Sequence, residues 1–444
     1  MTDNSEESQL VYICEQLQLC MLPALKEDLD EVQLLPEHFQ NYNSVLRQEL
    51  PKLYDVLQQI ENIILQDAAQ LKLRTQLVLL LCELTATPTV YKLSADAEAE
   101  LDNANRLLQK VSVGCHSAEA THIFSYYEQH LQGNCWKRQL GATHGYVRYL
   151  EYCCTGDARF PAKLITFSLA VGLNFRECYQ LEYKQLGVRI FQILLQHGTV
   201  GDIQKLNIHS VIFEHVFKDT HCMDSLEATI ATWSCLFLCL DHFTELNSFT
   251  WNQSDDMLER LIQNVNLAPN AETSIHLIGF ITKLCYHFTL NLNEIQVAFA
   301  SEHNEPNNIS DHLEICASLT ACTSYRWAKD ILQMFLLQSD KLFQSAKVCT
   351  RMLTEMQRCY LVCILPVPLE ALHIHLPEFY TKFVAILLES HVVHEKAPDI
   401  IKLTETFIEI FQYQLKNYSQ QQQPLGNVNE FARAFKSLQK IVAK

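Results

Sequence analysis

Three stretches of the chain repeat one apolar pattern at a constant offset of 45 residues. Residues 182–195 read EYKQLGVRIFQILL, residues 227–240 read EATIATWSCLFLCL, and residues 272–285 read ETSIHLIGFITKLC. Each stretch opens on a glutamate, and its apolar residues recur at the spacing of one helix face. The equivalent apolar positions are Val188, Trp233 and Ile278, then Ile190/Phe191, Cys235/Leu236 and Phe280/Ile281, then Leu194, Cys239 and Leu284.

A second helix precedes each of these stretches at the same offset of 45 residues. A repeat of two helices in about 40–47 residues is typical of HEAT and armadillo proteins. One helical hairpin cannot bury its apolar face alone, so stacked hairpins share a continuous core. The pattern therefore predicts an all-α fold, an α-solenoid of irregular HEAT/armadillo-like helical hairpins. The matching positions of the preceding helices are Phe167, Ile212 and Met257, followed by Val171, Val216 and Leu261.

The composition favours the same fold. Among 444 residues there are 11 glycines and 12 prolines, and the first glycine is Gly114. Such a chain lacks the glycine-rich turns of most β-sandwiches, barrels and doubly wound nucleotide-binding folds. Hydrophobic residues make up 48% and charged residues 19%, which is enough apolar material for a sizeable core.

The chain is acidic, with a formal net charge of −17. A surface of this sign repels phosphate backbones and anionic lipids, so we expect binding to neither nucleic acids nor membranes. Residues 1–111 hold 18 acidic and 8 basic side chains and include the acidic run Lys26–Glu31 (KEDLDE). This run is either a solvated surface segment or a site that recruits a basic partner.

The cysteines and the N-terminal sequence bear on localisation. Most of the 17 cysteines lie in apolar helical runs, which is typical of buried thiols in a reducing compartment. The acidic start MTDNSEE does not resemble a secretory or transit peptide. The longest uncharged apolar stretch, residues 228–240, has 13 residues, against roughly 20 needed to span a bilayer. We expect a soluble cytoplasmic protein, with the nucleus left open as a second location.

Further helices are expected on both sides of the repeats. Pro51 should stand in the first turn of a helix over 52–66 that follows a helix over 38–50. One helix is expected over 341–364, and Pro377 should kink or split another over 368–390. The expected regions are an acidic N-terminal helical region over 1–135, a HEAT-like repeat core over 136–298, C-terminal helical repeats over 310–418, and a linker with a terminal amphipathic helix over 419–444.

Sequence motifs give little sign of chemistry, because the chain has no phosphate-binding loop, nucleophile elbow, HExxH zinc motif or kinase signature. The best metal-like grouping is Cys235, Cys239 and His242, which share a helix face and would need a fourth zinc ligand from elsewhere. Both cysteines occupy repeat positions that are apolar in the other two units, so core packing is favoured, and we expect no catalytic residue, metal or cofactor. The same two interpretations apply to Cys359/Cys363. Cys153/Cys154 is either a redox pair or a helix end packed in the core, and the latter is favoured. His373/His375 and His391/His394 are either ligands or pH sensors, or pairs expected by chance among 18 histidines.

An amphipathic helix is expected near the C-terminus, over about 428–442. It either docks in a groove of a partner or caps the solenoid. The predicted partner-binding residues are the region 310–420 and four residues of this helix. Its apolar face holds Phe431, Phe435, Leu438 and Val442, its basic residues are Arg433, Lys436, Lys440 and Lys444, and the four predicted binding residues are Phe431, Arg433, Phe435 and Lys436.

Two segments carry a family resemblance. One is YLEYCCTGDARFP over residues 149–161, with the apolar residues that follow it, and the other is the first repeat stretch, residues 182–195. Together they resemble the Tti-two family, the second Tel-two-interacting proteins, which are subunits of the Triple T cochaperone complex. The likeness covers residues 149–240, but residues 172–175 (GLNF) stand where the family usually has an acidic pair. The positions matching the family pattern K-x-x-G-x-x-x-L-x-x-L are Lys184, Gly187, Phe191 and Leu194.

The resemblance implies a non-enzymatic scaffold subunit. The family forms a trimeric complex with two larger helical-repeat subunits. That complex helps the ninety-kilodalton heat-shock chaperone to mature the phosphatidylinositol-3-kinase-related protein kinases. The family uses the C-terminal part of its solenoid to contact a partner subunit, which by analogy places the interface within residues 310–420. The alternative is a HEAT-repeat transport or cargo-adaptor protein that binds basic partners through its acidic surface.

Overall fold

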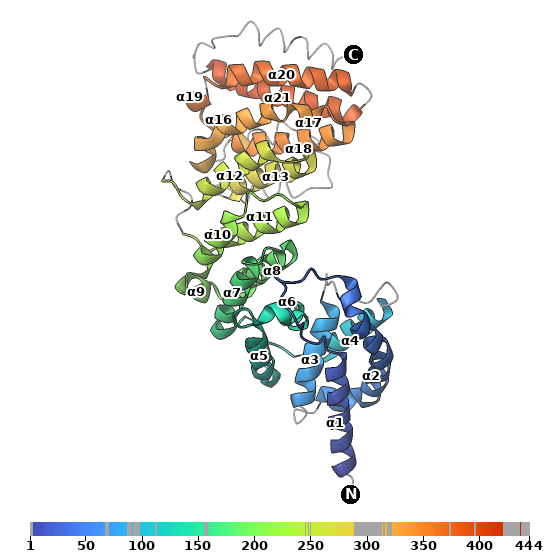
Figure 1. The fold of residues 1–444 in the computed structure, drawn as a ribbon. Helices are drawn as coiled ribbons and strands as arrows, with labels where there is room; N and C mark the ends of the chain where they lie inside the picture. The colour runs from blue at the N-terminus through green and yellow to red at the C-terminus, as the bar shows by residue number, and fades with distance from the viewer. Residues whose placement is uncertain are drawn as a thin grey trace. The chain divides into compact units, whose positions relative to one another are not determined.

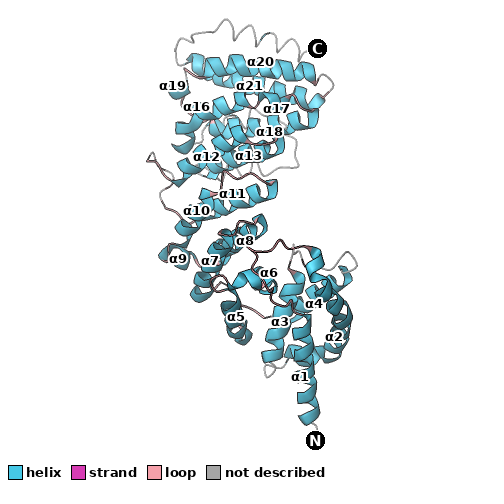
Figure 2. Cartoon of the chain, in the orientation of Figure 1, coloured by secondary structure: helices cyan, strands magenta, loops and turns pink. Residues whose placement is uncertain are grey.

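The computed structural model of the chain is helical, and the residues that it describes contain no strand (Figure 1, Figure 2). These residues are 3–66, 71–86, 91, 98–111, 113–154, 159–244, 246, 248, 250–287, 313, 316–317, 322–372, 374–394, 397–420 and 436. The all-α prediction is thereby confirmed for this part of the chain. The chain divides into two compact units, Met1–Val216 (unit 1) and Phe217–Lys444 (unit 2), and the boundary falls inside the region 136–298.

Unit 1 is organised around the helix α3. This helix packs against α1, α4, α5 and α6, and its stretch from Leu77 to Cys82 is buried on all sides. The helices of unit 1 are α1 (Asp3–Cys20), η1 (Pro36–Phe39, a 3-10 helix), α2 (Gln40–Gln66), α3 (Leu71–Thr85), α4 (Glu98–Val111), α5 (Ala118–Leu131), η4 (Cys135–Arg138, a 3-10 helix), α6 (Leu140–Cys153), α7 (Ala162–Arg176), α8 (Leu181–His197), α9 (Val200–Lys205) and α10 (Ile208–Lys218), which crosses the boundary.

The pair α7 and α8 packs closely because each helix has a glycine at the contact. A Cβ added to Gly187 would lie 2.7 Å from the carbonyl oxygen of Gly172, and one added to Gly172 would collide with the ring of Phe191. Without side chains, the two backbones can approach at this point. Gly187 belongs to the pattern that carries the family resemblance, so that pattern has a packing role here.

The predicted break at Pro51 is wrong, because α2 continues through it as one helix. A proline inside a helix costs about 3 kcal/mol through a lost hydrogen bond and a steric clash. Burial of the flanking leucines offsets this cost, since each buried leucine contributes roughly 1.5–3 kcal/mol. Leu46, Leu50, Leu53 and Leu57 are each no more than 3% exposed. Pro51 itself lies on the exposed side of the helix.

Unit 2 is a two-layer stack of helix pairs, seen from yellow to red in Figure 1. The first helices α12, α16 and α20 contact one another in succession, and so do the second helices α13, α18 and α21. This is how helical-hairpin repeats bury their apolar faces. The helices are α11 (Leu226–Leu240), α12 (Gln253–Leu267), α13 (Ala271–His287), α16 (Cys322–Leu337), α17 (Ser339–Leu342), α18 (Ala346–Cys363), α19 (Leu369–Leu372), α20 (Leu376–Val393) and α21 (Pro398–Gln420).

The offset of 45 residues read from the sequence corresponds to real helix starts. Glu182, Glu227 and Glu272 are each the second residue of a helix, namely α8, α11 and α13. An acidic residue there suits the positive end of the helix dipole. The apolar residues six positions later are buried, with exposed fractions of 2% for Val188 and 0% for Trp233 and Ile278.

Two expectations for the C-terminal helices had different outcomes. Pro377 does split its segment, since it stands in the first turn of α20 after the short helix α19. The single helix expected over 341–364 is wrong, because α17 ends at Leu342 and α18 begins at Ala346. Ser345 caps α18, where its hydroxyl accepts a hydrogen bond from the Val348 N–H at 3.3 Å. A serine that caps a new helix favours this restart.

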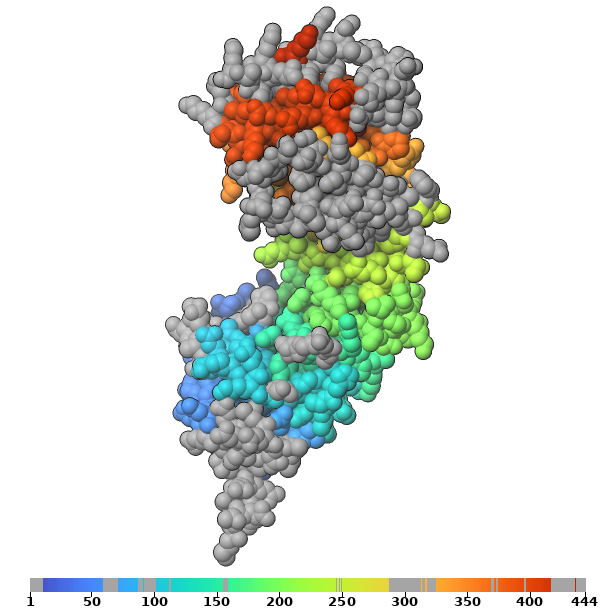
Figure 3. All heavy atoms as spheres, turned by 180° about the vertical axis from the view of Figure 1, so that it is seen from behind, coloured from blue at the N-terminus to red at the C-terminus, as the bar shows by residue number. Residues whose placement is uncertain are grey.

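The helix α21 covers the stack with an amphipathic face. Phe407 and Phe411 point into the core with no exposed surface, whereas Lys402, Glu405 and Glu409 are exposed. Its orange-red residues lie at the surface on the face seen in Figure 3. Within the described part of the chain, no helix is both long enough and apolar enough to cross a membrane.

Candidate protein-binding surface

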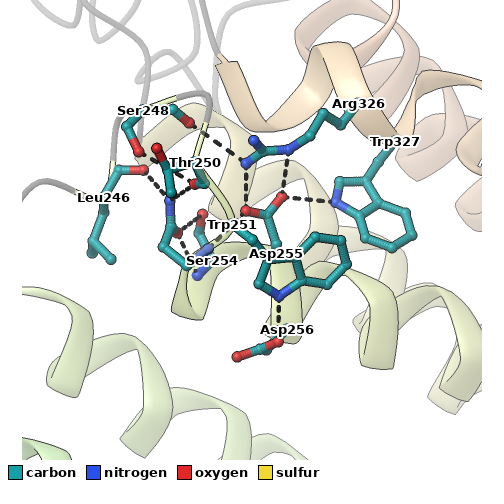
Figure 4. A network of polar contacts seen from close by, with 10 residues as sticks. Leu246, Ser248, Thr250, Trp251, Ser254, Asp255, Asp256, Arg326 and Trp327 are labelled. Atoms are coloured by element: carbon teal, nitrogen blue, oxygen red, sulfur yellow. Dashed lines mark hydrogen bonds and ion pairs between the residues drawn. The ribbon is translucent and has the colours of Figure 1, made fainter.

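A polar network joins the beginning of α12 to α16 (Figure 4). Asp255 stands in the first turn of α12, and its side chain has no exposed surface. Arg326 donates from Nε to Asp255 Oδ1 at 2.9 Å and from Nη2 to Oδ2, and Trp327 Nε1 donates to Oδ1 at 3.0 Å. A buried carboxylate needs such pairing, and the two-pronged contact fixes the guanidinium plane. The network therefore holds the two helices in one geometry.

The loop that leads into α12 is fixed by Asn252, the N-cap residue of this helix. Its Oδ1 accepts from the Ser254 N–H at 2.9 Å, and Asp255 Oδ2 accepts from the Asn252 N–H at 3.1 Å. This reciprocal arrangement is a capping box. The Asn252 amide nitrogen also donates to the carbonyls of Leu246 at 2.9 Å and Thr250 at 3.0 Å. The loop backbone is thereby tied to the helix that follows it.

Trp251 stands on this fixed base and faces solvent. Its side chain is 54% exposed, and its Nε1 donates to Asp256 Oδ1 at 2.7 Å. Its ring meets that of Trp327 edge-on, with centroids 5.6 Å apart and an interplanar angle of 64°. We call Trp251 and Trp327 the aromatic edge. Tryptophan, tyrosine and arginine are the residues most enriched in binding hot spots.

Exposed aliphatic side chains mark the opposite ends of the same helices. Leu267, Leu337 and Val392, near the C-terminal ends of α12, α16 and α20, are 74%, 58% and 68% exposed. Lys341 of α17 contacts α13 and the end of α12 there, since its Nζ donates to Ser274 Oγ at 2.6 Å and to the Ala268 carbonyl at 3.4 Å. Scattered aliphatic residues are ordinary on protein surfaces. The aromatic edge is therefore the stronger candidate for a binding site.

The metal-like grouping lies in the core, but only its two cysteines share a helix face, because α11 ends at Leu240, before His242. Cys235 and Cys239 have no exposed surface, and His242 is 6% exposed. Burial and the neighbouring Cys235 thiol raise the pKa of Cys239, which disfavours the thiolate that a metal requires. Among the described residues, no group of three or more His, Cys, Asp and Glu side chains is placed to hold a metal ion.

The structure brings some of the other paired residues together. Cys359 and Cys363 lie in the core with their sulfurs 3.7 Å apart. Cys153 lies at the end of α6, and its free thiol forms a hydrogen bond with the thiol of Cys115. This hydrogen bond lowers the pKa of Cys115 to about 6. His394 Nε2 lies 2.9 Å from the Leu342 carbonyl oxygen. His391 lies in the last turn of α20 and His375 precedes its first turn, while His373 is outside the described residues.

The predicted partner-binding residues are only partly described. The region 310–420 contains Arg326 and Trp327 of the aromatic edge, and Lys436 is exposed. Phe431, Arg433 and Phe435 lie outside the described residues. Trp251 and Asp255 were missed by the sequence reasoning. The signal was present, because Asn252 and Asp255 have the spacing of a capping box next to one of the 4 tryptophans of the chain.

No protein-family model, curated protein or solved structure matches this chain. The family resemblance therefore rests on the residues of the segment 149–240 alone.

Proposed function

We propose that the chain is a non-enzymatic helical-repeat scaffold that binds other proteins through the aromatic edge. The observation that carries this proposal is the exposed ring of Trp251, held by its bond to Asp256 and its contact with Trp327. Aromatic side chains that are already fixed lose little conformational freedom on binding. They are therefore efficient anchors for a partner.

Its particular role, on the sequence resemblance, is that of the Tti-two subunit in a cochaperone complex of the Triple T kind. The partners would be two larger helical-repeat subunits. The heat-shock chaperone and the phosphatidylinositol-3-kinase-related kinases, whose maturation and stability the complex supports, would join indirectly. The support is the likeness over residues 149–240, together with the helix-pair packing of unit 2. Trp327 falls within the interface region 310–420 that the resemblance implies.

One observation favours the second candidate, an adaptor for basic cargo, namely the net charge of −17. A complex held by charge weakens as salt screens the charges, with a Debye length of about 3 Å at 1 M ionic strength. An apolar interface anchored by aromatic residues should survive the same salt. Salt dependence therefore separates the two functions.

The test is affinity purification of the full chain in moderate and high salt, followed by mass spectrometry. We expect two large helical-repeat proteins to remain bound in high salt. Trp251→Ala should reduce their recovery, since a hot spot of about 2 kcal/mol corresponds to about 30-fold in affinity. Tyr12→Ala is the matched control, because Tyr12 is an aromatic residue of unit 1 with 48% exposure.

Two results would contradict this proposal. Loss of every partner in high salt, with basic proteins bound in low salt, would establish the adaptor instead. Equal recovery with Trp251→Ala and with Tyr12→Ala would show that the aromatic edge is not the interface.

A further inference from the structure

The acidic run of unit 1 does not stand free in solvent. Residues 25–31, which we call the strap, lie between α1 and η1 and form no helix. Within the strap, Leu29 has no exposed surface although charged residues flank it on both sides. A buried leucine between two aspartates indicates that the strap is seated on a surface, with its apolar side chain inward.

The strap is bound to η4 by charge and by its backbone. Lys137 Nζ lies 2.5 Å from Asp30 Oδ2, and Arg138 Nε lies 2.5 Å from Asp28 Oδ1. The Leu25 N–H donates to the Arg138 carbonyl at 2.8 Å. Each aspartate therefore meets its own cation, on either side of the buried leucine.

The turn between α7 and α8 holds the centre of the strap. The Tyr179 hydroxyl and the Gln180 side-chain amide both donate to the Leu29 carbonyl, at 3.4 and 3.3 Å. We call Lys137, Arg138, Tyr179 and Gln180 the strap site. Residues 28–31 of the strap form a turn, in which the Glu31 N–H donates to the Asp28 carbonyl at 2.9 Å. The site holds this turn through the Leu29 carbonyl, the inward Leu29 side chain and the two carboxylates.

The polar contacts of the strap are partly exposed to solvent, so a competing ligand can replace them. In the two ion pairs, the side chain of Arg138 is 51% exposed and that of Asp30 is 45% exposed. Ion pairs open to solvent are weak and are screened by salt. Tyr179 is 67% exposed, so water can compete for its hydrogen bond as well.

We infer that the strap is an internal ligand, and that the strap site binds an acidic–leucine–acidic peptide of a partner protein when the strap is displaced. Charge complementarity selects this occupant, because Lys137 and Arg138 form a paired basic site on a chain of net charge −17. A tethered segment competes at an effective concentration on the order of millimolar, so the intact chain holds the site closed. The inference rests on unit 1 and is independent of the function proposed for the aromatic edge.

The test uses the full chain with Asp28→Asn and Asp30→Asn, which releases both ion pairs from the strap side. The probe is a fluorescent synthetic peptide with the sequence of residues 24–33 (ALKEDLDEVQ), followed by fluorescence anisotropy. We expect the released variant to bind this peptide roughly tenfold or more tightly than the natural chain. Raising the salt from about 0.05 M to about 0.5 M should weaken that binding.

Two controls decide the outcome. Adding Lys137→Glu and Arg138→Glu to the released variant should abolish binding, and a probe with serine in place of its central leucine should bind poorly. Equal binding by the natural and released chains, or binding indifferent to the Lys137 and Arg138 changes, would overturn the inference. So would a loss of hydrogen-exchange protection across α6 and α8 in the released variant, because the strap would then be an integral part of unit 1.

Discussion

Two buried carboxyl side chains, Glu83 in unit 1 and Asp255 in unit 2, are stabilised differently. Asp255 in unit 2 faces the guanidinium of Arg326. Glu83 in unit 1, on α3, meets the neutral Leu22 N–H and the Tyr42 hydroxyl. Burial raises the pKa of Glu83 to about 8, although both hydrogen bonds oppose the rise. Glu83 is therefore mostly a neutral acid at pH 7, whereas Asp255 is one half of an ion pair.

The surroundings of Glu83 explain its neutral state. A Cβ on Gly141 of α6 would collide with the Glu83 carboxyl, so this glycine lets the α6 backbone close over it. His144, also on α6, is buried, and burial lowers its pKa to about 4. The Tyr91 ring lies between those of Tyr42 and His144, with centroids 6.5 and 5.7 Å away. A site closed by neutral groups favours the protonated acid, whereas the Arg326 contact favours the carboxylate.

The largest expected effect is that of breaking the ion pair in unit 2. Asp255→Ala leaves Arg326 without its carboxylate and removes half of the capping box. Loss of one partner of a buried pair costs about 3–5 kcal/mol. We expect about 3 kcal/mol here, because the Arg326 side chain keeps 22% of its surface exposed. Hydrogen exchange of the α12 and α16 amides would measure the cost as a lower free energy of opening.

Asp256→Ala is the control for this change, since Asp256 lies in the same turn but is partly exposed and bonds Trp251. It should cost about 0.5 kcal/mol or less, as is usual for surface substitutions. Equal costs for Asp255→Ala and Asp256→Ala would remove the distinction between the two buried carboxyls.

The next effect is a dependence of the stability of unit 1 on pH, which arises from Glu83. The folded pKa of Glu83, about 8, lies above its ordinary value of 4.5, so the folded state holds a proton that the unfolded state has released. Its contribution to stability is complete below pH 4.5 and is lost as the pH rises through 8. The slope is at most about 1.4 kcal/mol per pH unit, or about 1–2 kcal/mol between pH 6.5 and 8.

Glu83→Gln should remove this slope, because the amide resembles the protonated acid and does not titrate. Urea unfolding of both chains at several pH values, followed through exchange of the α3 and α6 amides, would measure the difference. The comparison cancels shared contributions such as that of His144, whose lowered pKa makes stability rise with pH between about 4 and 6.5. Parallel pH profiles for the two chains would show that Glu83 is ionised in the fold.

Sequence reasoning found the helices better than it found the sites. The glutamates at an offset of 45 residues located three helix starts, because helix periodicity and first-turn charge are local properties. The Asp255–Arg326 contact joins residues 71 positions apart, so no local pattern indicates it. The predicted helix break at Pro51 was wrong for the reverse reason. The local preference of proline was overridden by the burial of the neighbouring leucines in tertiary packing. For the acidic run, the sequence left open a solvated segment or a site for a basic partner. In the structure its aspartates bind Lys137 and Arg138, which lie more than 100 residues away in the sequence.

The smallest expected effect is that of Trp327→Phe, which tests which partner stabilises the Asp255 carboxylate. Trp327→Phe removes the indole N–H that donates to Asp255 Oδ1 but leaves both Arg326 contacts in place. Loss of one hydrogen bond of this kind costs about 1 kcal/mol, well below the cost of Asp255→Ala. The same exchange measurement on α12 would test the ranking. If Trp327→Phe cost as much as Asp255→Ala, the indole rather than the guanidinium would stabilise the carboxylate. Asp255 would then depend on a neutral donor, as Glu83 does, and cationic pairing would no longer distinguish these two carboxyls.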